Sequence, residues 1–146
     1  KEGTSGGKII GNRLDGAGIS GENYADSWLD VKGNGYQITR NTAFNRDPSA
    51  LSDGFQTHFK PGGWGQGNVF SNNVLTVNAG GYGFNIQMKH ENAGDNVVEN
   101  NNVVTGASMG YSNVIPVRAA AAVSANAVTS ASNPDELPTT LSDPQP

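Results

Sequence analysis

Three stretches of the sequence place side chains that can do chemistry along one side of a strand. Successive side chains on a strand face opposite sides. If the apolar residues point inward, the residues next to them point outward. The three stretches are 26–32, 53–59 and 82–88. The predicted inward residues are Leu29, Val31, Phe55, Thr57, Phe59, Phe84, Ile86 and Met88. The predicted outward residues, which carry carboxylate, ammonium, amide and imidazole groups, are Asp30, Lys32, Gln56, His58, Lys60, Asn85, Gln87 and Lys89.

The outward set suits β-elimination on a sugar acid. That reaction needs a base for the proton beside a uronate carboxyl and a cation for the charge that develops. We expect Lys32, Lys60 or His58 to be the base, with Asp30 beside them and a neighbouring lysine or a bound calcium ion at the uronate. His58 is the preferred base because the chain has only 2 histidines and imidazole titrates near neutral pH. A structural interpretation stays open, in which Asp30 and Lys32 form a solvated surface pair.

The remaining outward residues predict sugar binding. Amide groups of Gln56, Asn85 and Gln87, and the Lys89 ammonium, can bind hydroxyl and carboxyl groups. Trp64, in the glycine-rich stretch 61–67, is the preferred platform for a sugar ring, the alternative being a loop anchor. Trp28 is expected to cover a corner of the core.

Three aspartates form a second candidate set. Asp26, Asp30 and Asp53 can supply the two carboxyl groups of a glycoside hydrolase, or oxygen ligands for calcium. Asp26 and Asp53 suit turn-forming roles equally well. No other cofactor is predicted, and zero cysteines exclude thiolate metal sites.

An internal repeat indicates which elements must position these side chains. Apolar residues precede Asn12, Asn41, Asn73 and Asn101 by three positions, and the asparagines lie 29, 32 and 28 residues apart. A second series, Leu29, Phe55 and Phe84, is spaced by 26 and 29. Repeats of this length with short strands and Gly/Asn corners predict an all-β, right-handed parallel β-helix of about four coils. An asparagine at the same corner of each coil can satisfy turn groups through its amide. An antiparallel sandwich accounts less well for the recurring corners.

Composition restricts the alternatives. Glycine is 20 of 146 residues and asparagine 18, which disfavours a helical bundle. The formal net charge is −4, and residues 1–118 hold all 9 basic residues against 10 acidic ones. Without a basic face, nucleic acid is not an expected partner, and no apolar run is long enough for a membrane span.

The C-terminal part differs from the repeats. Residues 119–146 are rich in Ala, Ser and Pro and carry three acids and no base. We therefore divide the chain into β-helix coils over 1–118 and a cap with an acidic tail over 119–146.

Five segments, which include KEGTSGGKIIGN and SDGFQTH, resemble coils of secreted microbial proteins of the pectate-lyase-like superfamily. The five segments are 1–12, 25–42, 52–58, 63–73 and 80–86. The resemblance covers about residues 1–115. It implies an extracellular protein that acts on or adheres to polysaccharide. Members of this superfamily are usually longer, so the chain is expected to be a C-terminal portion.

The sequence therefore predicts a secreted polysaccharide-binding β-helix protein, and a uronan lyase if it is an enzyme. The alternative is a non-catalytic structural or adhesive module. Its exposed strand edges would stack end to end with another copy.

Overall fold

The computed structural model describes residues 2–20, 26–48, 51–86 and 94–119. Within these ranges every regular element is a β-strand. No helix in this part of the chain is long and apolar enough to cross a membrane.

Twelve strands form three sheets of four strands each. The first sheet contains β1 (Lys8–Ile10), β4 (Gln37–Thr39), β7 (Val69–Ser71) and β10 (Val97–Val98). The second contains β2 (Arg13–Asp15), β5 (Thr42–Phe44), β8 (Val74–Ala79) and β11 (Val103–Ala107). The third contains β3 (Leu29–Val31), β6 (Phe55–Thr57), β9 (Tyr82–Asn85) and β12 (Gly110–Ser112).

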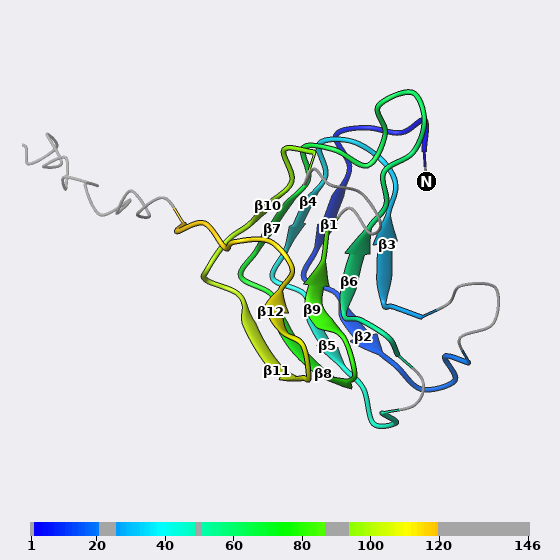
Figure 1. The fold of residues 1–146 in the computed structure, drawn as a ribbon, viewed down its shortest axis with the longest axis vertical. Coiled ribbons are helices and arrows are strands. Elements are labelled where there is room, and N and C mark those ends of the chain that lie inside the picture. Colours follow the sequence, from blue (N-terminus) through cyan, green and yellow to red (C-terminus); the bar gives the residue numbers. More distant parts are fainter. Residues whose placement is uncertain (1, 21–25, 49–50, 87–93, 120–146) are drawn as a thin grey trace, which may run out of the picture.

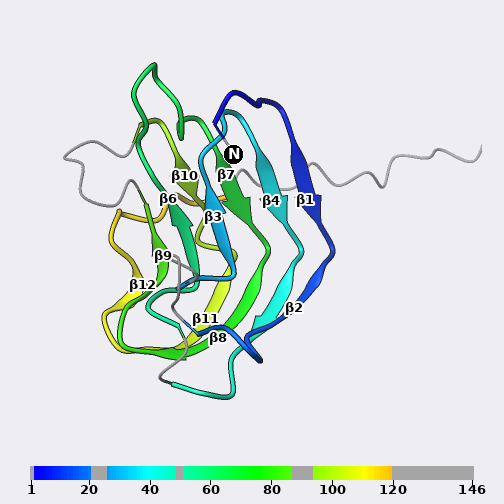
Figure 2. The ribbon, with the colours of Figure 1, turned by 90° about the vertical axis from the view of Figure 1, so that its right-hand side faces the viewer.

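The chain visits the three sheets in turn, and every strand pairing is parallel. It passes through each sheet four times, which makes about three complete turns of a solenoid (Figure 1). Figure 2 shows the three sheets as separate sides around one interior. The predicted all-β parallel β-helix is confirmed.

Stacked apolar side chains fill the interior. Phe55, Phe70 and Phe84 are completely buried, and their ring centroids lie 5.6 to 6.3 Å apart. Each buried phenylalanine contributes about 1.5–3 kcal/mol to the stability of the fold. Trp28 packs edge-on against Phe55 at a centroid distance of 6.4 Å, so the prediction that it covers a corner of the core is confirmed.

An asparagine ladder occupies the corner between the first and second sheets. The Nδ2 of Asn12 donates to Oδ1 of Asn41, Asn41 donates to Asn73, and Asn73 donates to Asn102, over 2.8 to 2.9 Å. The same Oδ1 atoms accept the backbone N–H groups of the preceding members. Each buried member also satisfies a strand-end carbonyl, such as Ile38 O by Asn73. Otherwise these corner groups would be buried without partners.

The fourth member of the ladder differs from the prediction. Asn102 holds the corner, and the neighbouring Asn101 instead accepts the backbone N–H of Asn72. Three consecutive asparagines at 100–102 make the register ambiguous in the sequence. A separate asparagine pair that the spacing did not predict lies where the first sheet begins, before β7 and β10. There Asn68 donates to Asn96 through a 2.9 Å amide hydrogen bond.

The predicted alternation in the third sheet holds with two exceptions. Val31, Phe55, Thr57, Phe84 and Ile86 are buried as expected, and Leu29 is half-buried. Phe59 was expected to point inward but is 38% exposed, because regular strand geometry ends at Thr57. Gln56 was expected to face solvent but is completely buried.

The remaining sequence predictions lie largely outside the described residues. Met88, Gln87, Lys89 and, apart from Ala119, the cap and tail of 119–146 fall there.

Candidate functional site

A charged cluster is formed by residues of the third sheet and of the turns that follow its strands, together with Glu2, which precedes β1. It consists of Glu2, Asp30, Lys32, His58 and Lys60. Asp30 is in β3, Lys32 follows that strand, and His58 follows β6. Because Asp30 pairs with Gln56 and Val31 with Thr57, continuing the register brings Lys32 beside His58. Parallel pairing thus assembles groups that are 26 to 28 positions apart in the sequence.

Asp30 is the centre of this cluster. Its Oδ1 lies 2.8 Å from Nδ1 of His58, and its Oδ2 forms an ion pair with the Lys32 ammonium. The Asp30 and His58 side chains are 19% and 26% exposed, respectively. They are therefore held by partners yet accessible from solvent.

The surroundings of Asp30 keep its carboxyl ionised. Burial raises the pKa of Asp30, but the hydrogen bonds and positive charges of His58 and Lys32 lower it by more. The pKa of Asp30 therefore lies below its ordinary value. A carboxylate at Nδ1 selects the His58 tautomer with the proton on Nδ1. The lone pair of the neutral ring is then on Nε2.

Lys60 is brought to the cluster by a turn at 60–64. Its backbone pairs with that of Trp64 in both directions, with N–O distances of 3.2 Å. The indole is half-exposed, so the structure places the predicted platform beside a predicted cation.

Glu2 is a member that the sequence did not indicate. Its own backbone hydrogen bond lowers its pKa and desolvation opposes this, while the charges of Lys60 and Lys32 lower the pKa further. Both ammonium groups therefore act on one carboxyl near the cluster. No repeat pattern marks Glu2, because it lies before the first strand.

Beside the cluster lies an amide–carboxyl network formed by Asp53, Gln56 and Asn85. Oδ2 of Asp53 accepts from Gln56 Nε2 at 3.0 Å and from Asn85 Nδ2 at 2.9 Å. Oδ1 of Asp53 accepts the backbone N–H of Tyr82 at 2.7 Å. Asp53 is 3% exposed, so it joins two coils instead of presenting a carboxyl to solvent.

The structure joins three of the predicted residues, Asp30, Lys32 and His58, by direct contacts. Lys60 lies near enough to Glu2 for its charge, like that of Lys32, to act on that carboxyl. Asn85 lies apart from them, in the amide–carboxyl network. Gln56 belongs to the same network, and its Oε1 is buried with no hydrogen-bond partner in the described part of the chain. Gln87 and Lys89 lie outside the described residues.

The three candidate aspartates are used differently. Asp30 belongs to the charged cluster and Asp53 to the network, while Asp26 contributes its backbone carbonyl to the N–H groups of Ser52 and Asp53. Among the described residues, no three His, Cys, Asp or Glu side chains are grouped so that they could hold a metal ion.

One solved structure is similar in fold and sequence. It is the crystal structure of an alginate lyase from Paenibacillus sp. str. FPU-7, with a TM-score of 0.67 and 33% sequence identity over 80% of this chain. Neither the family models nor the curated proteins contain a match. The aligned part of this chain corresponds to 38% of the length of that lyase. The chain is thus a parallel β-helix similar to part of a polysaccharide lyase.

Proposed function

We propose that this protein binds a uronate-containing polysaccharide and cleaves it by β-elimination at the charged cluster. The observation that carries the proposal is the Asp30–His58 hydrogen bond, which lies on an accessible face beside the Lys32 ammonium. The charge of Lys60 acts, with that of Lys32, on the nearby Glu2. The similarity to an alginate lyase supports alginate as the first polymer to test.

In the proposed reaction, His58 is the base. Its Nε2 takes the proton from the sugar carbon that bears the carboxyl group. The electrons of that C–H bond form a carbon–carbon double bond, and the bond to the glycosidic oxygen breaks with its electron pair. The leaving oxygen takes a proton from solvent, and His58 later releases its proton to solvent. The products are a shortened chain and a chain with an unsaturated end.

The charges around His58 suit this step. Asp30, whose lowered pKa keeps it ionised, orients the ring and stabilises the imidazolium that forms. Lys60 and Lys32 are the groups that would neutralise the uronate carboxyl as negative charge develops on it. Trp64, beside Lys60, would stack on a neighbouring sugar ring. The proposal includes a location outside the cell, where a polysaccharide of this kind would be met.

The test follows the ultraviolet absorbance of unsaturated products with alginate, and with pectate as a second uronan. Lys60→Ala should lower activity on alginate, whereas Lys8→Ala should not, because Lys8 is an exposed lysine on β1 of another sheet. Absence of unsaturated product from both polymers would refute the enzymatic proposal.

Polysaccharide binding without cleavage is the second candidate. It is favoured by the finding that the chain matches 38% of the similar lyase. Calorimetric binding of alginate with no unsaturated product would support it over the lyase.

A further inference from the structure

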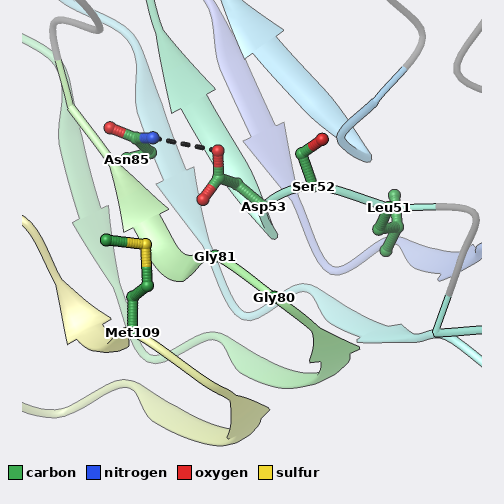
Figure 3. A pocket seen from close by; sticks show the side chains of 7 residues that line it. All are labelled: Leu51, Ser52, Asp53, Gly80, Gly81, Asn85 and Met109. Carbon is green, nitrogen blue, oxygen red and sulfur yellow. Dashed lines mark hydrogen bonds between the residues drawn. The ribbon is translucent and has the colours of Figure 1, made fainter.

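A pocket at the same sheet as the charged cluster has the chemistry of a second sugar site. Its volume is about 400 Å³, which is in the range of small-ligand sites. It is lined by Leu51, Ser52, Asp53, Gly80, Gly81, Asn85 and Met109 (Figure 3). None of these seven residues is basic. The pocket therefore differs from the charged cluster, which is suited to a carboxylate.

The wall of the pocket is held rigidly. Asn85 Nδ2 is committed to Asp53 at 2.9 Å, and Figure 3 shows the Asn85 amide oxygen pointing away from Asp53. Gly81 permits this arrangement, because a Cβ there would lie 2.1 Å from Asp53 Oδ1. The amide oxygen is thus fixed as an acceptor without having to lose rotamer freedom on binding.

The other lining groups complete a surface for the hydroxyl and C–H groups of a sugar residue. Ser52 is exposed and carries a hydroxyl that can donate or accept. Met109, which is 61% exposed, offers apolar contact to the C–H face of a ring, whereas Leu51 is 4% exposed and belongs to the core. Gly80 leaves open space, since a Cβ there would meet no atom within 4 Å.

The strand register relates the pocket to the charged cluster. Asp30 pairs with Gln56, and Gln56 pairs with Asn85, on three adjacent strands. Two strand spacings separate Asp30 from Asn85, or about 10 Å. One oligosaccharide that lies across the strands can contact both places.

We infer that this pocket binds the hydroxyl-bearing side of a sugar residue in the same polysaccharide whose uronate lies at the charged cluster. The inference rests on the proposed function. It assigns Asn85 and Ser52 as hydrogen-bonding residues and Met109 as the apolar contact of a subsite that discriminates by chain length.

The test fills the pocket with a large side chain at Gly80, where the wall has open space. Calorimetry compares an alginate disaccharide with an alginate hexasaccharide on protein with the wild-type pocket and on Gly80→Trp, each also carrying His58→Ala so that the oligosaccharide is not cleaved during the titration. The wild type should bind the hexasaccharide more tightly, and Gly80→Trp should weaken its binding about tenfold, to the level of the disaccharide. Thr76→Trp, on the exposed face of β8, should change neither. Met109→Ala, which keeps the fold free of a bulky insertion, should weaken hexasaccharide binding about threefold.

A hexasaccharide with its carboxyl groups reduced to alcohols separates the two proposals. If the charged cluster does not bind uronate but the pocket binds sugar, this neutral ligand still binds the wild type and is lost in Gly80→Trp. If Gly80→Trp and Met109→Ala both keep wild-type hexasaccharide affinity, the pocket assignment is wrong and the lyase proposal stands. Failure of every oligosaccharide to bind overturns both.

Discussion

The asparagine ladder and the charged cluster are both polar assemblies built by stacking equivalent positions of successive coils, but they differ in burial. Asn41 and Asn73 are completely buried, and their amide groups are hydrogen-bonded on both sides. Asp30 and His58 remain 19% and 26% exposed. The same repeat therefore makes a buried structural network at a corner and an accessible polar group on a face.

Asn73→Ala should produce the largest loss of stability. It removes an acceptor for two Asn41 donors and a donor to Ile38 O and Asn102. Buried groups left without partners cost about 1–3 kcal/mol each, and with partial relaxation we expect a decrease of about 3 kcal/mol in the free energy of unfolding. Urea denaturation measures it, and a loss below about 1 kcal/mol would mean that the ladder does not hold the corner.

Asn12→Ala tests the same ladder where it is exposed. The Asn12 side chain only donates, to Asn41 Oδ1, and the backbone N–H of residue 12, which donates to the same oxygen, remains in the variant. The expected loss is about 1 kcal/mol, measured by the same denaturation. Equal effects at positions 12 and 73 would contradict the importance of burial.

Acidification should weaken the charged cluster. Because the Asp30 pKa is lowered in the folded protein, its contribution to stability is complete above the unfolded value of about 4. That contribution is lost as pH falls below this value through the folded pKa. Thermal unfolding between neutral pH and this acidic range should show an acid-dependent decrease that is reduced in Asp30→Asn. An identical pH dependence of the variant would remove Asp30 from this role.

Arg40→Asn should have the smallest effect, and it should be stabilising. The residue before the ladder asparagine has a left-handed backbone at Gly11, Arg40 and Asn72, with φ of 68°, 56° and 53°. Asparagine tolerates this region better than arginine, so we expect a gain of about 0.5 kcal/mol in unfolding free energy. Asn72→Arg is the matched reverse change, and a gain in that variant would contradict this explanation.

The repeat in the sequence was sufficient to predict the solenoid and three positions of its ladder, because stacking requires similar residues at similar corners. It was also sufficient to bring Asp30, Lys32 and His58 together. The alternation of apolar and polar residues predicts which side of a strand a residue faces, but not what covers that side. The burial of Gln56 was therefore missed. Glu2 was missed because it lies outside the repeat, although the charges of Lys60 and Lys32 act on its carboxyl.

The pocket shows the same limit. Met109 lies far in sequence from Ser52 and Asn85, and neither spacing nor residue type indicates that they line one space. Asp53 was weighed as a turn residue or an acid, yet it links coils through Tyr82 and Asn85. Such contacts between coils depend on the distance by which each coil is displaced along the solenoid axis, and the sequence does not show this distance.

The most direct measurement compares His58→Ala with the wild type in both activity and stability. We predict that unsaturated product from alginate falls at least about 100-fold, while the melting temperature falls only slightly, because the variant loses one partly exposed hydrogen bond, to Asp30. Activity retained in His58→Ala, or lost only together with the fold, would contradict the central claim that the charged cluster is a site for chemistry.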